Sequence, residues 1–196
     1  MSELTGSGQG RKRRSDARRS AAAVLDAAVA VLGQRPEASV EEIAAAAGVT
    51  RQTVYAHHPS RQALREAVID RITEEFLAAV AAARLEEDTA TEALVRWLDT
   101  AWRVMERYPL LLHPSAAEGA SDRSLERHLP VLDQLRRLVR RGQHAGEFDL
   151  DQPIDWLLAA TVALGHAAGE EVAAGRMSAR QAAEQLRTSV LRLYRH

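Results

Sequence analysis

Apolar residues recur at intervals of three and four along most of this chain, and the strict alternation that is typical of β-strands is missing. Each such run predicts a helix with one apolar face. The longer runs cover residues 16–33, 60–83, 89–108, 124–141, 153–174 and 178–194. With two shorter helices between residues 39 and 60, and a short helix or loop over residues 110–119, they predict an all-α protein of about nine helices.

The stretch from Ser39 to Leu64 carries clear signals for where helices begin and end. Ser39 and Glu42 have the spacing of a capping box, Gly48 can end the first helix with a positive φ, and Thr50 can cap the next. The outer face of this second helix carries Arg51, Gln52, Thr53 and Tyr55. A helix, a glycine turn and a short polar helix is the plan of a helix-turn-helix that reads the DNA major groove.

The same stretch also keeps a longer motif of apolar, glycine, cap and polar positions in one register. The motif consists of Ile43, Ala44, Ala47, Gly48, Val49, Thr50, Thr53, Val54, Tyr55, His57, Ser60, Arg61 and Leu64. At these residues the chain resembles the tetracycline-repressor (TetR) family of bacterial regulators. Arg61 stands at a position that is usually Lys and keeps the charge, whereas His58 puts a polar ring at a position that is usually Phe. We therefore expect His58 to lie partly buried at the edge of the core of this helix-turn-helix region. There it should make the stability of the region sensitive to pH near neutrality.

This resemblance implies two parts, a helix-turn-helix head that binds DNA and a helical body that binds an effector and dimerises. We expect a disordered basic arm over residues 1–14, the helix-turn-helix domain over residues 15–60, and the effector-binding and dimerisation domain over residues 61–196. In the family, the long helix that begins near residue 60 links the two, so that a change in the body can re-aim the head.

A cluster of basic residues precedes the predicted head, at Arg11, Lys12, Arg13 and Arg14. Such an arm can enter the minor groove beside the major-groove helix, where arginine senses the negative potential of a narrow groove. It can equally be a solvated run of charge that attracts phosphates of any sequence.

Within the motif, the residues divide by chemistry into base-reading and phosphate-binding candidates. Arginine binds guanine through two hydrogen bonds, glutamine pairs with adenine, and threonine offers a hydroxyl or methyl group. The base-contact candidates are Arg51, Gln52 and Thr53. The phosphate-contact candidates, which set the register on DNA without reading sequence, are Thr50, Tyr55, His57 and Arg61.

Large aromatic residues are few, at 4% of the chain, yet they gather in the predicted helix over residues 89–108. Such a stripe serves either a packed core or a ligand cavity lined by rings. The resemblance favours a cavity, since family members commonly hold an effector between the middle helices. The pocket candidates are Trp97, Ala101, Trp102, Met105, Leu112, His113, His128 and Leu132.

The last two predicted helices, over residues 153–174 and 178–194, have wide apolar faces. These faces suit either an ordinary intrachain core or a four-helix contact between two copies. The resemblance favours the dimer, because a palindromic DNA site requires a two-fold partner. The interface candidates are Trp156, Ala160, Leu164, Leu186, Val190 and Tyr194.

The histidines permit a different function. A metal ion could be bound by His113, His128 and His166 with Glu118 or Glu170, since imidazole and carboxylate groups are common metal ligands. These residues are not spaced as in a known metal-binding motif. Polar pocket or surface histidines are the simpler interpretation. The sequence also lacks a glycine-rich phosphate loop, a nucleophile elbow and any cysteine. We therefore expect no cofactor and no enzymatic activity.

Composition adds a few limits. The absence of cysteine suits a reducing compartment, and no long apolar run predicts a membrane span, so we expect a cytoplasmic protein. The net charge of −1 makes a general attraction to nucleic acid weak. The overall prediction is a ligand-responsive homodimeric repressor that binds a palindromic operator and is released by a small, mainly apolar effector. The alternatives are a DNA-binding protein without an effector, and a helical metal-binding or enzymatic domain that uses His113 and His166.

Overall fold

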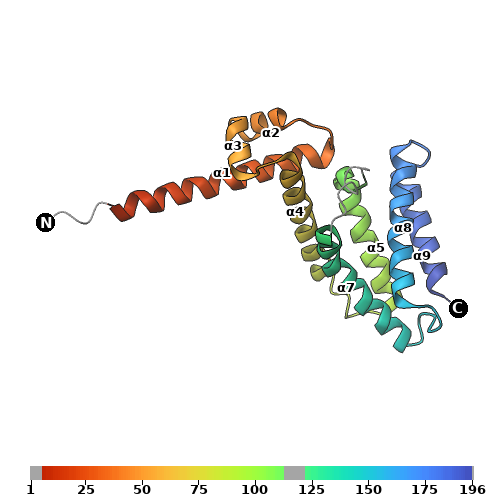
Figure 1. The fold of residues 1–196 in the computed structure, drawn as a ribbon. Helices are drawn as coiled ribbons and strands as arrows, with labels where there is room; N and C mark the ends of the chain where they lie inside the picture. Colours follow the sequence, from red (N-terminus) through yellow and green to blue (C-terminus); the bar gives the residue numbers. More distant parts are fainter. Residues whose placement is uncertain (1–5, 113–121, 196) are drawn as a thin grey trace. The chain divides into compact units, whose positions relative to one another are not determined.

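The computed structural model describes residues 6–112 and 122–195, and it describes side chains over residues 17–111 and 130–195. The chain divides into two compact units, Met1–Arg71 and Ile72–His196, which we call the head and the body. Every regular element within the described ranges is helical, which confirms the predicted fold class (Figure 1).

The head contains α1 (Gly6–Gln34), α2 (Val40–Ala47), α3 (Arg51–His57) and the first part of α4 (Arg61–Ala82). α1 packs against both α2 and α3. The head's core consists of Val24, Ala28, Leu32, Ile43, Val54, Leu64 and Val68, each at most 1% exposed. The division between the units therefore falls inside α4 rather than near residue 60, because the first turns of α4 belong to the head's core.

The first helix is longer than expected. α1 begins at Gly6, so the backbone of residues 6–14 is helical and the expectation of a disordered arm there is wrong. From Arg11 onward the arginine, lysine and alanine residues have high helix propensity and no proline interrupts the helix, whereas the glycines at positions 6, 8 and 10 do not favour it. Residues 1–5 lie outside the described part, as do the side chains of Arg11, Lys12, Arg13 and Arg14.

The turns of the head follow the predicted caps closely. Ser39 Oγ accepts the backbone N–H of Glu42 at 3.2 Å, and the Glu42 carboxylate accepts the N–H of Ser39 at 2.8 Å. The backbone hydrogen bond from Ser39, together with the guanidinium of Arg35, lowers the pKa of Glu42 to about 2. Gly48 has a φ of 66°, and the Thr50 hydroxyl accepts the N–H of Thr53 at 3.2 Å. Local sequence thus holds α2 and α3 in a fixed relation.

In the body, the later part of α4 is followed by α5 (Ala90–Arg107), the short 3₁₀ helix η1 (Pro109–Leu112), α7 (Asp122–His144), α8 (Ile154–Ala173) and α9 (Ala179–Tyr194). α5 packs on α7 and α9, and α8 packs on α7 and α9 (Figure 1). The largest fully buried side chains of this unit are Ile72, Leu94, Leu110, Leu135, Phe148, Leu157 and Tyr194. None of the described helices combines the length and apolar character that a bilayer span requires.

Near the end of α7, Gly142 packs tightly against the ring of Phe148. The N–H groups of Glu147 and Phe148 both donate to the carbonyl of Gly142, which folds the Phe148 ring back over that glycine. A Cβ atom at Gly142 would lie only 2.2 Å from the ring. Phe148 in turn meets the Tyr194 ring edge-on, with 5.1 Å between centroids. Burial raises the pKa of Tyr194 to about 12, while its hydroxyl lies 2.9 Å from that of Thr161.

Side chains of α7 and the turn after it also hold the segment that precedes α5. The Glu147 carboxylate accepts the N–H groups of Ala90 and Thr91 at 2.9 and 2.8 Å, which occupies two free donors at the start of α5. Arg141 donates to the carbonyl oxygens of Leu85 and Asp88 at 2.8 and 3.2 Å. These contacts join parts of the chain that are far apart in sequence.

Candidate functional site

The first turn of α3 presents polar side chains to solvent while its opposite side faces the core. Arg51 and Gln52 are exposed and Thr53 is half-buried, whereas Val54 is only 1% exposed. Because Val54 fixes which side of α3 faces inward, the N-terminal turn of the helix stays available to a DNA groove.

Arg51 has two partners within the head. Its guanidinium forms an ion pair with Glu41 of α2 and lies over the Tyr55 ring at 5.4 Å from the centroid. The interaction with Tyr55 and the charge of Glu41 raise the pKa of Arg51. Both members of the ion pair are more than half exposed, so solvent screens the pair and it remains easy to exchange.

Two of the phosphate-contact candidates already serve the fold. Thr50 is exposed and uses its hydroxyl as the cap of α3, where it also lies 2.9 Å from the hydroxyl of Thr53. The Nε2 atom of His57 lies 3.1 Å from Ser20 Oγ of α1. These contacts hold α3 in place on α1 and at its own N-terminus.

His58 is half-buried at the end of α3, as expected for a polar ring at a core-facing position. Burial, and then the charge of neighbouring His57, lower the pKa of His58 below its usual value. A lowered pKa means that the folded head binds this proton less readily than the unfolded chain does.

Two arginines of α4 hold the turn that leads into α2. Arg61 and Arg65 each donate to the carbonyl oxygen of Pro36 at 3.2 Å. Sequence reasoning identified Arg61 by its motif position but missed Arg65, which is only 7% exposed. The spacing of Arg65 four residues after Arg61, on the same helical face, was the signal available in the sequence.

A cavity of about 160 Å³ lies within the body. Its lining residues are Ile72, Thr73, Phe76, Trp97, Ala101, Val104, Met105, Leu111, Val131 and His166. Trp97, Ala101 and Met105 were predicted to contribute to a pocket. Trp102 is buried and Leu132 half-buried, but neither lines this cavity.

Three of the predicted pocket residues lie outside the described side chains. His113 lies outside the described residues, and the side chains of Leu112 and His128 are likewise outside the described part. Of the lining residues that the sequence did not reveal, Val104 lies on α5 itself, and the others come from α4, η1, α7 and α8 and reach α5 only through tertiary packing.

Trp97 is the most distinctive group of this cavity. Its ring packs edge-on against Phe76 with 5.7 Å between centroids, and the residue is only 5% exposed. Its indole N–H is buried and has no hydrogen-bond partner among the described residues. A buried donor without a partner is unfavourable, so a ligand that supplies an acceptor there would gain affinity.

The outer face of α8 leaves apolar side chains exposed. Trp156 is 57% and Val162 is 39% exposed, while Ala160 and Leu164 are half-buried. The other three interface candidates, Leu186, Val190 and Tyr194, are buried inside the body and cannot reach a partner directly. Helical periodicity showed an apolar face on α9, but that face packs within the chain.

Among the described side chains, no group of three or more histidine, aspartate or glutamate residues comes together in a way that could hold a metal ion. His166 is exposed and lines the cavity of about 160 Å³. His113 and Glu118 lie outside the described residues, and so does the side chain of His128.

The capped α2–α3 unit and the helical body together define a helix-turn-helix protein with a separate all-α domain. Residues 24–68 match the family model for bacterial regulatory proteins of the tetR family. A 46-residue segment is 50% identical to the HTH-type transcriptional repressor LfrR of Mycolicibacterium smegmatis, an alignment that covers 24% of each chain.

Solved structures extend the likeness to the body. The TetR-like regulator LfrR from Mycobacterium smegmatis, in complex with proflavine, superposes with a TM-score of 0.69 and 26% identity over 88% of this chain and 94% of that one. FadR from Bacillus subtilis, in complex with stearoyl-CoA, has a TM-score of 0.71 at 18% identity, over 88% of this chain and 96% of that one, and shows the same fold. Over its DNA-binding region the chain matches the tetR family model, and its fold is similar to that of TetR-like transcriptional regulators.

Proposed function

We propose that this protein is a homodimeric transcriptional repressor that binds a palindromic operator in the cytoplasm and leaves it when a small, mainly apolar effector binds the body. The main support is the first turn of α3, where Arg51 and Gln52 are exposed on a helix whose inward side is fixed by Val54. In this geometry Arg51, Gln52 and Thr53 read base edges. The DNA phosphates are contacted by Thr50, Tyr55, His57 and Arg61, together with Arg11, Lys12, Arg13 and Arg14, and these contacts fix the register of the protein on DNA.

The effector is proposed to occupy the cavity of about 160 Å³ in the body. The lining is mostly apolar, and the unpartnered indole N–H of Trp97 supplies a donor. A planar aromatic compound that carries an acceptor fits this chemistry. The complex of LfrR with proflavine is consistent with a ligand of that class.

Dimerisation is proposed to use the outer face of α8. Trp156 is the largest exposed apolar side chain there, and half-buried Ala160 lies one turn further along the same face. A two-fold axis through α8 would bury Trp156 of both copies and place two heads for successive major grooves, about 34–36 Å apart. An effector that prefers a different arrangement of the body lowers DNA affinity by linkage, and a coupling of about 1–3 kcal/mol suffices.

Selection of bound sequences from random DNA tests the DNA-binding role, because a recovered palindrome also reports the half-site spacing. Arg51→Ala should then weaken operator binding about tenfold or more and leave binding to random DNA nearly unchanged. Arg61→Ala should weaken both and lower the salt slope by about 1. Equal losses of Arg51→Ala on operator and random DNA would contradict base reading.

Two further measurements test the dimer and the effector separately. Trp156→Glu changes an exposed residue, so it should leave the fold intact and convert a dimer to a monomer in light scattering. Proflavine should raise the melting temperature of the protein, and less so after Ala101→Leu, which fills the cavity. If no aromatic compound stabilises the protein, the effector-independent alternative holds.

A further inference from the structure

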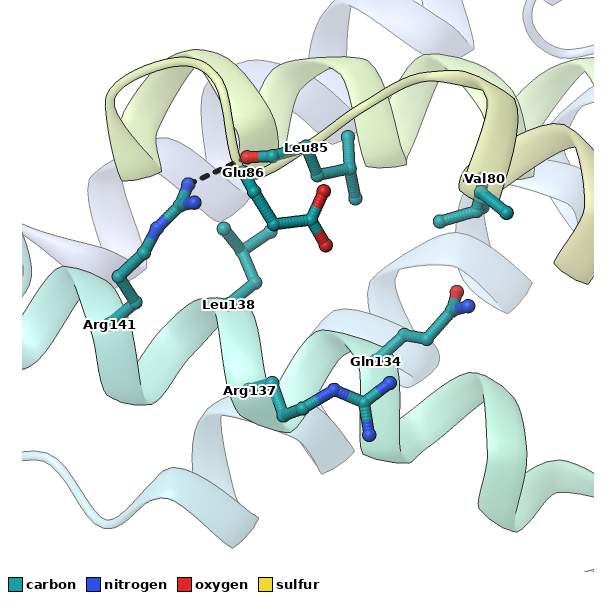
Figure 2. Close-up of a pocket in the computed structure, with 8 residues that line it drawn as sticks. Val80, Leu85, Glu86, Gln134, Arg137, Leu138 and Arg141 are labelled. Carbon is teal, nitrogen blue, oxygen red and sulfur yellow. Dashed lines mark hydrogen bonds between the residues drawn. The ribbon is translucent and has the colours of Figure 1, made fainter.

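The body contains a second cavity, of about 330 Å³, with a different character. It is lined by Val80, Ala81, Leu85, Glu86, Gln134, Arg137, Leu138 and Arg141. Figure 2 shows its two sides: α7 carries Gln134, Arg137, Leu138 and Arg141, and the end of α4 with the following segment carries Val80, Leu85 and Glu86. It shares no lining residue with the cavity around Trp97.

The lining has an excess of positive charge. Arg141 is half-buried and donates to the carbonyl oxygen of Leu85 (Figure 2) and to that of Asp88. Arg137 lies one helical turn earlier and is exposed, with no hydrogen bond or ion pair among the described residues. Glu86 is the one carboxylate of the lining, and it pairs with neither guanidinium in the structure. Two cations a turn apart repel each other mildly, and an anion between them relieves that repulsion.

Some arginines of α7 have partners that stabilise the fold, and Arg137 has none among the described residues. Arg136 pairs with Asp133 at 2.9 Å and with Asp155 at 2.7 Å, and Arg141 fastens the segment before α5. Arg137 has no such structural partner, although it borders a cavity. Its guanidinium is therefore free to bind a group from solution.

Two more features of the cavity indicate the chemistry of a ligand that would bind Arg137. The Gln134 side-chain oxygen is buried without a hydrogen-bond partner, so it can accept an N–H or O–H from a ligand. Val80, Leu85 and Leu138 are each at most 8% exposed and form an apolar surface beside it. An inorganic anion would leave this apolar surface unused, and a purely apolar compound would leave Arg137 and Gln134 unpaired.

We propose that this cavity is a second binding site, for a small organic anion with an apolar body and one hydrogen-bond donor. The anionic group lies between Arg137 and Arg141, the apolar body rests on Val80 and Leu138, and the donor reaches Gln134. The site does not depend on the proposed role of the Trp97 cavity.

Calorimetric titration of the full chain with indole-3-acetate tests this proposal, because the probe has a carboxylate, a ring and an N–H donor. Its matched neutral control is indole-3-acetamide, which should bind at least about fivefold more weakly. Arg137→Gln should weaken indole-3-acetate binding by about the same factor, with a loss that shrinks at high salt. Arg140→Gln removes an exposed charge of the same helix outside the lining and should change affinity less than about twofold.

A second matched pair tests the shape of the site. Ala81→Leu intrudes on the cavity, whereas Ala82→Leu changes an exposed neighbour on α4 that does not line it. Only Ala81→Leu should weaken binding, and thermal unfolding should show both variants folded. Equal affinity for the acid and the amide, equal effects within either pair, or no binding of indole-3-acetate at millimolar concentration would each overturn the proposal. If neither Arg137→Gln nor Ala81→Leu changes the affinity for indole-3-acetate, the probe binds at another site and the proposal is wrong.

Discussion

The head and the body hold their helix ends in different ways. In the head, the caps of α2 and α3 join residues three positions apart, Ser39 with Glu42 and Thr50 with Thr53. In the body, α5 and α9 have local caps of the same kind, Thr89 with Glu92 and Ser178 with Gln181, but the start of α5 is also held by Glu147, which lies 57 positions after Ala90. A helix end held by local bonds keeps its shape when its surroundings move, whereas an end that is also held by a distant residue transmits a change from one helix to another. The head is thus suited to present a fixed surface, and the body to respond.

The largest expected effect comes from breaking the packing at the end of α7. Gly142→Ala puts a Cβ atom 2.2 Å from the Phe148 ring, so the ring must move and the free energy of unfolding should fall by about 3 kcal/mol. Urea unfolding measures this. Gly165→Ala is the control, because its Cβ would meet Met105 at 3.8 Å, an ordinary contact. If the two substitutions cost the same, the close packing of Gly142 is not what stabilises this end of the body.

A smaller effect should follow when Glu147 is removed. Glu147→Ala leaves the N–H groups of Ala90 and Thr91 without their acceptor, so the body should lose about 2 kcal/mol. Ser39→Ala removes only a local cap of the head and should cost about 1 kcal/mol. Hydrogen exchange distinguishes the two, since Glu147→Ala should loosen both α5 and the end of α7, and Ser39→Ala only α2. Loosening confined to α5 after Glu147→Ala would contradict the coupling.

The smallest expected effect concerns pH. Burial, and then the charge of His57, lower the folded pKa of His58 below 6.5, so the unfolded chain binds the proton more readily. The stability that neutral His58 provides is therefore present above pH 6.5 and is lost as pH falls through the lowered pKa. His58→Phe should remove this component, which is below about 1 kcal/mol because the ring stays half exposed. Thermal unfolding between pH 5 and 8 tests it, and an unchanged pH profile in the variant would rule it out.

The same difference explains which features the sequence revealed. The caps at Ser39 and Thr50 and the turn at Gly48 depend on neighbours within a few residues, so residue type and spacing were enough to predict them. The half-buried position of His58 followed from its place in the motif. The sequence did not reveal that Glu147 caps α5, because that contact exists only after α7 has packed on α5.

In the candidate sites, too, the sequence revealed the features of single helices and not the contacts between helices. Periodicity placed Trp97, Ala101 and Met105 on one apolar face of α5, and the family resemblance assigned them to a pocket. Apart from Val104 of α5, the other residues that line their cavity come from α4, η1, α7 and α8. On α9, periodicity identified the apolar side chains of Leu186 and Val190 but not which surface covers them, and they proved to be core. Helical period identifies the apolar face of a helix, and only the assembled fold shows what packs against it.

The ion pair between Arg51 and Glu41 has a consequence for how DNA sequences are told apart. If Arg51 reads a base, it must first leave Glu41, and a base pair without a suitable acceptor offers nothing in exchange. The carboxylate thus lowers the affinity for the operator, where Arg51 must give up the ion pair, more than the affinity for random DNA, where Arg51 can stay paired. Glu41→Gln should accordingly bind the operator more tightly and widen the ratio between operator and random affinity, and an unchanged ratio would show that Glu41 takes no part in the choice.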